Sequence, residues 1–442
     1  MKVGFISLGC SKNLVDTEMM IGLFEKNKYQ IVNNPEEAEI LMINTCGFIE
    51  SAKEEAINTI LEMAEYKKKN CKYLIVTGCL VQRYKEELEK ELPEVDLLIT
   101  IDEYDKLWDK VTNLIGKGII DESVGKVKDY RQLDYLDRKI TTSGYYAYLK
   151  IAEGCSNYCT YCAIPKIRGP YISRKMEEIL KEAKKLSDAG VEELIVIAQD
   201  TTKYGIDLYG EPKLSELLRE LCKLNFKWIR FLYAYPETIT DELIETVREE
   251  EKICKYFDIP IQHISDPVLK RMGRRSTSDT IRNVIKKIRK EIPDVVLRTT
   301  FITGFPGETE EQFEELKKFV EEAKFDRLGV FPYSKEEGTP AVKLDGHMKM
   351  NLKKARANEI MKIQKKVSRE NNEKLIGKEL EVLIENITDD GEYYIGRSTR
   401  EVPDDTDGII FIKNTEELII GNFIKAKVEK ALDYDLIADI VK

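Results

Sequence analysis

Apolar runs alternate with amphipathic stretches over the first 135 residues, as expected for a chain that alternates between strands and helices. The helical stretches include Ser51–Tyr66 and Val81–Glu91. The strand-like runs are Val3–Leu8, Ile40–Ile43, Leu74–Thr77 and Leu97–Ile101. Strands that alternate with helices form parallel sheets with helices on both faces. We therefore predict a doubly wound parallel sheet in a first domain, residues 1–135.

A second strand–helix series follows a charged, aperiodic stretch at residues 121–142, which we interpret as a linker. Its predicted helices include Met176–Ala189, with Gly190 as C-cap, and one that begins after a capping-box pattern at Thr309 and Gln312. The six predicted strands are Ala147–Ile151, Leu194–Ala198, Trp228–Leu232, Phe257–Pro260, Val295–Thr303 and Leu328–Pro332. Six such units predict an open, partial (β/α)6 barrel in a second domain, residues 141–371. By analogy with complete barrels, its reactive end is the carboxyl end of the strands.

The pattern changes again near the C-terminus. His347–Asn372 is typical of one long, lysine-rich helix. Short β-like runs separated by turn residues then follow, at Leu380–Ile384, Tyr393–Arg397, Gly408–Ile412 and Phe423–Val428. They predict a small all-β barrel in a third domain, residues 372–442. The expected fold class is thus α/β, with an N-terminal doubly wound sheet, a central partial barrel and a small C-terminal β-barrel.

The composition narrows the class of protein. The chain has 442 residues, 42% of them hydrophobic, and a formal net charge of −10. A strongly acidic total argues against a protein that coats nucleic acid non-specifically. The sequence shows no transmembrane run and no secretory signal, so we expect a cytoplasmic protein without membrane association. In a reducing compartment its nine cysteines are expected to be ligands, catalytic groups or free thiols rather than disulfides.

Three cysteines follow the first strand of the predicted barrel. Cys155, Cys159 and Cys162 have the spacing C-x3-C-x2-C. Three thiolates on one loop can hold three irons of a [4Fe–4S] cluster and leave the fourth iron open to a small chelating molecule. The alternative is a structural zinc site, which usually needs a fourth Cys or His nearby. The two histidines of the chain, His263 and His347, lie more than a hundred positions away.

This triad resembles the signature of the radical S-adenosylmethionine superfamily, C-x3-C-x-aromatic-C, in which Tyr161 fills the aromatic slot. The resemblance implies that Tyr161 packs near the adenine of S-adenosylmethionine, whose reductive cleavage yields a 5′-deoxyadenosyl radical that abstracts hydrogen from an unactivated C–H bond. The stretch FITGFPGET at 301–309 resembles the glycine-rich strand end that approaches the cofactor, with Gly304 allowing close approach. Gln199, at another strand end, is a further cofactor candidate. For both residues a plain strand-end turn is the alternative.

A second trio of cysteines closes three predicted strands of the first domain. Cys10, Cys46 and Cys79 each stand at the carboxyl end of a strand. Neighbouring parallel strands deliver their carboxyl ends to one crevice, so these thiols can meet and hold a second [4Fe–4S] cluster with an open iron. The alternative is three buried cysteines that act as small hydrophobic residues. The remaining thiols, Cys71, Cys222 and Cys254, are interpreted as ordinary ones, with Cys71 at the opposite end of its strand.

Taken together, the two trios and the terminal barrel resemble the methylthiotransferase family, with the last domain similar to a TRAM domain. The resemblance covers essentially the whole chain. It implies an auxiliary cluster whose open iron carries a sulfide or persulfide sulfur. It also implies one S-adenosylmethionine that provides the radical and a second that provides the methyl group. An electron donor such as flavodoxin or ferredoxin is the expected partner.

Two motifs resemble the RimO branch of that family. They are CSKNLVDTE at 10–18 and CAIPKIRG at 162–169. The resemblance implies methylthiolation of the β-carbon of an aspartate in small-subunit ribosomal protein twelve. The alternative is a tRNA adenosine methylthiotransferase of the MiaB type, which performs the same chemistry on a nucleoside.

The charge of the last domain favours a protein substrate. Residues 373–442 hold 9 Lys and Arg against 17 Asp and Glu, a net charge of 9 − 17 = −8. Such a barrel repels a phosphate backbone and attracts a basic ribosomal protein. The proposed contacts lie in one predicted loop, at Glu401, Asp404, Asp405 and Asp407. The alternative is a solvated acidic loop.

Overall fold

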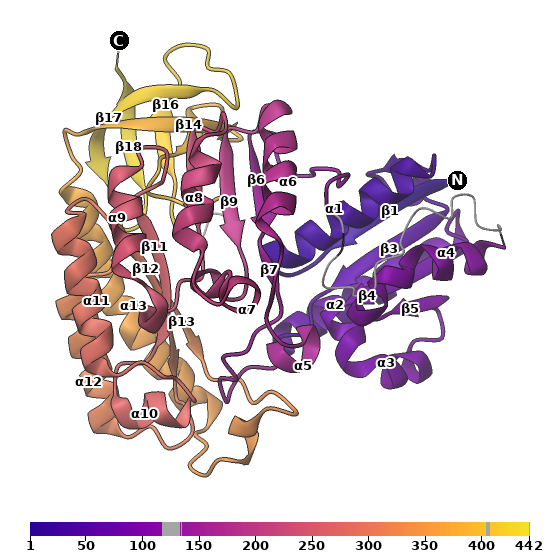
Figure 1. The fold of residues 1–442 in the computed structure, drawn as a ribbon, viewed down its shortest axis with the longest axis horizontal. Helices are drawn as coiled ribbons and strands as arrows, with labels where there is room; N and C mark the ends of the chain where they lie inside the picture. Colours follow the sequence, from indigo (N-terminus) through magenta and orange to yellow (C-terminus); the bar gives the residue numbers. More distant parts are fainter. Residues whose placement is uncertain (117–132, 134, 404–406, 442) are drawn as a thin grey trace.

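The computed structural model describes residues 1–116, 133, 135–403 and 407–441. Figure 1 shows an N-terminal α/β layer beside a central set of strands and helices, with a small β-structure at one end. Most of the predicted linker lies outside the described residues. None of the described helices is long and apolar enough to cross a membrane.

The N-terminal sheet is fully parallel, as predicted. Its strands run in the order β2-β1-β3-β4-β5. They are β1 (Lys2–Ser7), β2 (Gln30–Val32), β3 (Ile40–Thr45), β4 (Tyr73–Gly78) and β5 (Leu97–Ile99). Helices α1 (Ser11–Lys26) and α4 (Leu107–Ile115) pack with one apolar cluster, whereas α2 (Glu50–Ala64) and α3 (Cys79–Glu91) pack with another. The sheet is therefore covered on both faces. The strand order reverses between β1 and β3, where ligands bind in open α/β sheets.

The central domain is the predicted open barrel. Its parallel strands form two three-stranded sheets, β10-β9-β6 and β11-β12-β13. They are β6 (Tyr146–Lys150), β9 (Glu193–Ile197), β10 (Trp228–Phe231), β11 (Tyr256–Gln262), β12 (Val296–Thr303) and β13 (Arg327–Pro332). A single bridge, between Ile229 and Ile253, joins the β10 side to the segment before β11. The strand count and order match the prediction, while the hydrogen-bonded ladder is interrupted in the middle.

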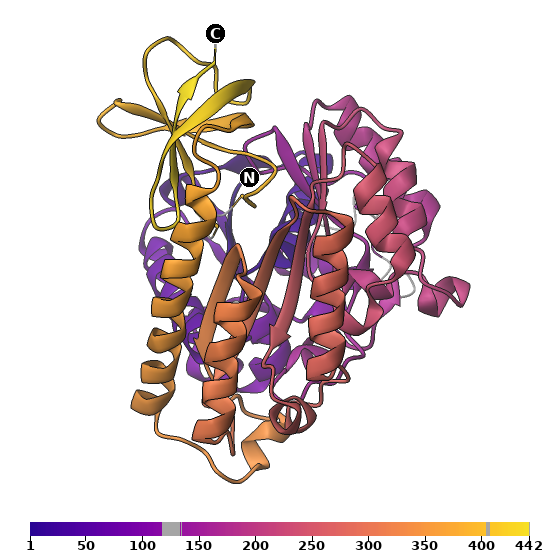
Figure 2. The same ribbon diagram turned by 90° about the vertical axis from the view of Figure 1, so that its left-hand side faces the viewer.

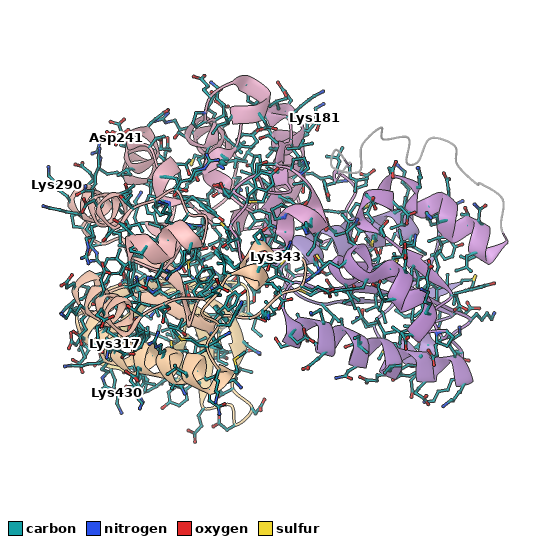
Figure 3. The ribbon with its side chains drawn as sticks, turned by 90° about the horizontal axis from the view of Figure 1, so that it is seen from below. Lys181, Asp241, Lys290, Lys317, Lys343 and Lys430 are labelled. Carbon is teal, nitrogen blue, oxygen red and sulfur yellow. The ribbon has the colours of Figure 1, made fainter. Side chains whose placement is uncertain are left out.

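Helices cover the outer face of these strands (Figure 2). The long ones are α6 (Met176–Asp188), α8 (Leu214–Cys222), α9 (Asp241–Glu249), α11 (Ser278–Glu291) and α12 (Glu310–Ala323), and the short ones α5 (Ile164–Arg168), α7 (Ile206–Tyr209) and α10 (Asp266–Arg271). The predicted capping box of Thr309 and Gln312 is present at α12. Charged side chains such as Lys181, Asp241 and Lys290 lie on this outer layer (Figure 3). A two-stranded ribbon, β7 (Ala152–Glu153) with β8 (Ile172–Ser173), flanks α5.

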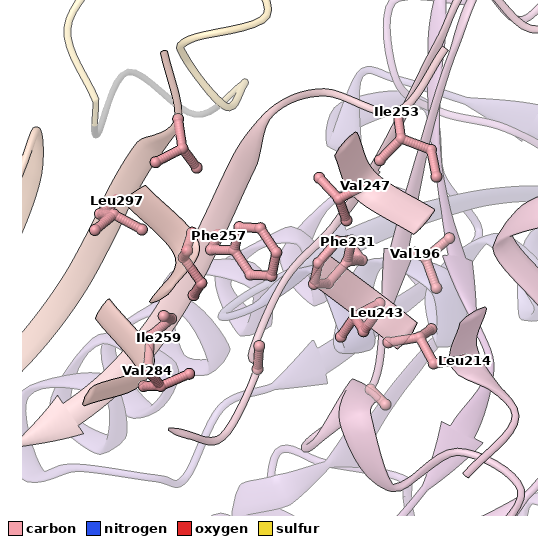
Figure 4. Packing of buried hydrophobic residues seen from close by; sticks show 14 of the residues in the cluster. Val196, Leu214, Phe231, Leu243, Val247, Ile253, Phe257, Ile259, Val284 and Leu297 are labelled. Carbon is pink, nitrogen blue, oxygen red and sulfur yellow. The ribbon is translucent and has the colours of Figure 1, made fainter. Parts of the chain in front are cut away.

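Alternation along the strands separates an outer from an inner face. On β11, Phe257 and Ile259 pack outward against helices, beside Phe231 of β10 (Figure 4). The preceding residue, Tyr256, belongs instead to the inner cluster, which also contains apolar residues of the N-terminal domain. The inside of the barrel is thus continuous with the interface between the first two domains.

The chain ends in a closed five-stranded barrel that follows the long helix α13 (Met350–Glu373). Its strands are β14 (Glu379–Ile387), β15 (Tyr393–Arg397), β16 (Ile410–Lys413), β17 (Phe423–Ala431) and β18 (Leu436–Ile440). The sequence pattern missed β18, the three-residue β2 and the two-residue strands β7 and β8. The prediction of a small all-β barrel is confirmed.

The predicted acidic contact loop is wrong for two of its residues. Glu401 and Asp407 are only 1% and 2% exposed. Glu401 accepts a hydrogen bond from Arg327 of β13 at 2.8 Å, and Asp407 accepts one from the Tyr256 hydroxyl of β11. These carboxylates fasten the C-terminal barrel to the amino ends of the central strands, because an arginine and a tyrosine there need acceptors. Asp404 and Asp405 lie outside the described residues.

Candidate functional site

Cys46 and Cys79 stand immediately beyond β3 and β4, and Cys10 stands three residues beyond β1. All three lie at the carboxyl edge of the sheet, whose strand order reverses between β1 and β3. Two glycines allow the three loops to approach closely. A Cβ on Gly9, whose φ is +88°, would lie 3.0 Å from the Cys46 Sγ. A Cβ on Gly47 would lie 3.0 Å from the Cys79 carbonyl carbon. The folding of the sheet therefore brings the three cysteine loops together.

The thiols of this trio have different electrostatic surroundings. Desolvation raises the pKa of the Cys10 thiol, but Lys12 and Arg168 outweigh it and hold that pKa below its ordinary value, although Cys10 keeps access to solvent. Burial raises the pKa of Cys79 to about 12, despite the Arg168 guanidinium. Burial raises the pKa of Cys46 as well. The Cys71 thiol donates a hydrogen bond to the Tyr73 carbonyl at 3.4 Å. Cys71 therefore lies at the amino end of β4, away from the trio, as predicted.

The second trio lies on the loop after β7. The Cys155 N–H donates to the Gly169 carbonyl at 3.1 Å, which closes the loop on itself. Asn157, between the first two cysteines, donates to the buried Asp200 at 2.9 Å. Asp200 stands at the carboxyl end of β9, so the barrel edge fixes the loop.

Burial and the proximity of other thiols oppose ionisation in this loop. They raise the pKa of Cys155 to about 11 and raise that of Cys162 as well. The buried Arg274 guanidinium lies 3.9 Å from the Cys159 Sγ and is held by the Pro260 carbonyl at 3.0 Å. Such thiols fit a cationic iron centre, which binds them as thiolates.

The two histidines of the chain, the candidates for a fourth zinc ligand, contact other groups in the described structure. The His263 Nδ1 accepts the Ser265 N–H at 3.0 Å, and the His347 Nε2 lies 3.1 Å from the Val342 carbonyl oxygen. Among the described residues, no three Cys, His, Asp or Glu side chains converge as ligands of one metal ion would. Each cysteine of a [4Fe–4S] cluster binds a different iron, so its ligands stand farther apart than those of a single ion.

The three candidate cofactor residues have different surroundings. Tyr161 packs beside Phe305, with ring centroids 6.4 Å apart. Gly304 has a φ of +69°, and an added Cβ would lie 2.4 Å from the Lys353 Cγ, so packing against α13 already requires glycine there. Gln199 is half-buried just beyond β9. Contact with S-adenosylmethionine stays a prediction for all three.

A buried charge network joins the two cysteine sites. Arg168, six positions after Cys162, donates to Asn13 at 2.6 Å, to Asp16 at 3.0 Å and to Glu153 at 3.0 Å. Asn13 in turn accepts from the Cys79 thiol at 3.6 Å. Lys150 completes the network through Glu153 at 2.8 Å and a further bond to Asp16. The loop of one trio is thus tied to the helix that follows the other.

Sequence reasoning missed Arg168 and Arg274 as site residues. Arg168 lies in the stretch that resembles the RimO branch, but nothing in the local pattern shows that it reaches Asn13 and Asp16, more than 150 positions earlier. Arg274 follows α10 and reaches Cys159 only through the folded barrel. Neither contact can be recognised from the neighbouring sequence, because each joins residues that are far apart along the chain.

We expect Arg168→Met to lower the free energy of unfolding by about 3–5 kcal/mol, because Asp16 and Glu153 would remain buried without their guanidinium. Urea denaturation followed by the fluorescence of Trp108 and Trp228 measures the change. The control is Arg369→Met, which removes a 43% exposed side chain and is expected to cost less than about 0.5 kcal/mol. Equal losses in the two variants would show that the network does not stabilise the domain interface.

Three family models match the chain. The Uncharacterized protein family UPF0004 matches residues 2–100, the radical SAM superfamily matches residues 149–320 and the TRAM domain matches residues 376–441. Each range falls inside one of the predicted domains, whose boundaries stay a prediction.

Solved structures share the fold. The radical S-adenosylmethionine methyltransferase TsrM from Kitasatospora setae aligns with a TM-score of 0.57 and 12% identity, covering 77% of this chain and 76% of that one. The cobalamin-dependent radical enzyme OxsB aligns with a TM-score of 0.53 and 15% identity, covering 82% and 56%. At these identities the likeness concerns the fold alone.

Curated relatives match from end to end. A protein of Alkaliphilus oremlandii is 60% identical over 442 residues, which cover 100% of this chain and 99% of the relative. One of Acetivibrio thermocellus is 52% identical, with 100% and 98% covered. Both bear the name ribosomal protein uS12 methylthiotransferase RimO. With this identity over its whole length, the chain belongs to the RimO family of radical S-adenosylmethionine methylthiotransferases.

Proposed function

We propose that this chain inserts sulfur into the β C–H bond of an aspartate in ribosomal protein uS12 and methylates that sulfur. The observation that carries the proposal is the 60% identity, over the full length, to a relative named for that activity. The buried link between the two cysteine sites supports it, since sulfur transfer needs both sites at one substrate. The same names favour a protein substrate over the tRNA alternative.

We propose two [4Fe–4S] clusters, one held by Cys155, Cys159 and Cys162 and the other by Cys10, Cys46 and Cys79. When bound, the clusters and S-adenosylmethionine supply the radical, the sulfur and the methyl group. The sulfur source is proposed to be sulfide or persulfide, and the electron donor a flavodoxin or ferredoxin.

The chain's own residues hold and order this site. Asp200 fixes the cysteine loop through Asn157, and Arg274 places a permanent positive charge beside Cys159. Tyr161 offers an aromatic face within an apolar cluster that includes Phe305 and Met272, a surface suited to an adenine ring. Burial of these groups excludes water from the place where a reactive radical would otherwise be quenched.

We propose that uS12 docks on an exposed acidic surface of the C-terminal barrel, in place of the buried Glu401 and Asp407. This acidic surface consists of two loops whose acids are exposed, namely Asp389, Asp390, Glu392, Glu416 and Glu417. The Asn414 side chain donates to the Gly391 carbonyl at 2.9 Å and so joins the loops. Ile419, 68% exposed, adds an apolar contact beside them. Acids around exposed apolar groups suit a basic protein partner.

We expect the double variant Glu416→Lys and Glu417→Lys to weaken uS12 binding about tenfold at low salt and less at high salt, because rim charges mainly act through screened attraction. Surface plasmon resonance with immobilised uS12 measures the affinity. The control is Glu249→Lys at the end of the outer helix α9. If the control lost the same affinity for uS12, or if the double variant lost none at low or high salt, the docking surface would lie elsewhere.

The substrate proposal is tested by mass spectrometry. The reconstituted enzyme, with S-adenosylmethionine, sulfide and reductant, is incubated with small ribosomal subunits and, separately, with bulk tRNA. We expect a methylthio group in place of one hydrogen on an aspartate of uS12 and unchanged tRNA. Modified adenosine with unmodified uS12 would reverse the assignment.

A further inference from the structure

The Lys12 side chain is largely buried, and its ammonium forms no ion pair among the described residues. Lys12 is 4% exposed, and within the described parts of the chain no hydrogen bond or ion pair involves its ammonium. Its contact is the face of the Tyr233 ring, whose centroid lies 3.4 Å away. A cation–π contact recovers only part of the cost of taking an ammonium out of water. Lys12 therefore carries a positive charge that can bind an anionic ligand, in addition to its electrostatic interaction with the Cys10 thiol.

Asp258, an acid close to Lys12 and Tyr233, already has other partners. Asp258 accepts the Tyr233 N–H at 3.0 Å and lies 3.9 Å from the Arg298 Nε. Asp258 interacts with Lys12 electrostatically but forms no ion pair with it among the described residues. The arrangement leaves the positive charge of Lys12 available to a ligand.

The barrel holds the aromatic partner in a strained conformation. Tyr233 has a φ of +63°, in the left-handed region that costs non-glycine residues energy. Its N–H is held by Asp258, and its carbonyl accepts the Thr201 N–H at 3.1 Å. Gln262, which ends the neighbouring strand β11, also has a positive φ of +74°. Strain at two adjacent strand ends is typical of a functional site.

The position of Lys12 connects the two halves of the site. Lys12 stands two residues after Cys10, in the first turn of α1, while Tyr233 stands just beyond β10 at the carboxyl edge of the barrel. An anion bound to Lys12 thus lies between the proposed sulfur-carrying cysteines and the reactive end of the barrel.

We propose that the Lys12 ammonium binds the side-chain carboxylate of the substrate aspartate. This inference rests on the proposed function, which places the reaction on the carbon bonded directly to that carboxylate. Holding the carboxylate fixes the reacting carbon one bond away and leaves its C–H bonds free. It also selects aspartate over asparagine, because a neutral amide leaves the buried ammonium without a counter-charge. Lys12 is thus assigned as a specificity-determining residue that touches the substrate.

The test measures binding of full-length uS12 to the cluster-loaded enzyme with S-adenosylmethionine present. Two forms of uS12 are compared, one with the target aspartate and one with asparagine in its place. Wild-type enzyme is compared with Lys12→Met, Lys12→Arg and the control Lys26→Met, which alters a half-exposed lysine at the other end of α1. Fluorescence anisotropy gives Kd, and iron analysis and circular dichroism check loading and folding.

We expect Lys12→Met to weaken binding of aspartate-containing uS12 about 30-fold, corresponding to about 2 kcal/mol. Its affinity for the asparagine form and for S-adenosylmethionine should stay within about twofold of wild type, because the lost interaction involves only the substrate carboxylate. Lys12→Arg should restore most of the discrimination, since it keeps the charge, and Lys26→Met should behave as wild type.

Equal weakening of both uS12 forms by Lys12→Met, or a selective loss of S-adenosylmethionine binding, would overturn the inference, the latter by assigning the lysine to the cofactor carboxylate. The inference would also be overturned if Lys12→Met failed to load iron and Lys12→Arg bound the aspartate and asparagine forms of uS12 equally. Lys12 would then have a structural role. If wild-type enzyme modifies uS12 but binds both forms alike, the inference fails while the proposed function stands. If wild-type enzyme leaves uS12 unmodified, both fail.

Discussion

Replacing Cys159 with alanine is expected to reduce release of 5′-deoxyadenosine from S-adenosylmethionine to background. Cys159 lies between Cys155 and Cys162 in the cysteine loop, beside Arg274. With two cysteine ligands in place of three, this loop should no longer hold its cluster stably. The variant should therefore retain about four of about eight irons, those of the N-terminal cluster. Anaerobic incubation with dithionite, followed by chromatography of the nucleosides, measures the effect.

The matched control is Cys222→Ala. Cys222 is half-buried at the end of α8, against the outer core of the barrel, and has no assigned role. This variant should keep its irons and its cofactor cleavage. Undiminished 5′-deoxyadenosine from Cys159→Ala would remove that cysteine from the radical-generating site.

Replacing Cys46 with alanine has a different expected outcome, because it should abolish the function of the N-terminal site and leave that of the radical-generating site. Methylthiolated uS12 should disappear, whereas 5′-deoxyadenosine should still form, since Cys46 follows β3 of the N-terminal sheet and lies outside the radical loop. Mass spectrometry of uS12 and nucleoside chromatography on the same reaction mixture measure both. About four irons should again be lost.

Cys71→Ala serves as the control for this variant, since Cys71 is a buried thiol at the opposite end of the same sheet. It should form product at a rate close to that of wild type. Full methylthiolation by Cys46→Ala would mean that the N-terminal cysteines do not carry the sulfur.

The fold was predictable where the signals were local and strong. The buried run at residues 40–45 and the alternating apolar positions Phe257, Ile259 and Ile261 indicate strands. Because helices lie between these strands in the sequence, parallel pairing is expected. The capping box at Thr309 fixed the start of α12. The strands that were missed, β2, β7, β8 and β18, are short or carry a polar residue, such as Asp439. Their pairing is decided by neighbouring strands rather than by their own pattern.

The candidate site was predictable as two groups of thiols but not as one connected network. Spacing along one loop identifies Cys155, Cys159 and Cys162, and strand ends identify the N-terminal trio. The groups that connect them, Lys12 and Arg168, act through residues far away in the sequence. Charge alone gave a wrong prediction of the docking surface, because Glu401 forms a buried ion pair with Arg327. A carboxylate in a loop has the same sequence signal whether it faces solvent or a buried guanidinium.

The central claim is that two trios of thiols each hold an iron–sulfur cluster and open toward one shared chamber. An anomalous-scattering map at the iron edge, from crystals of the anaerobically reconstituted protein, tests it most directly. The account predicts two separate groups of iron density, one against Cys10, Cys46 and Cys79 and one against Cys155, Cys159 and Cys162, both at the interface between the first two domains. A single group of iron density, or a second one that faces away from the barrel, would contradict it.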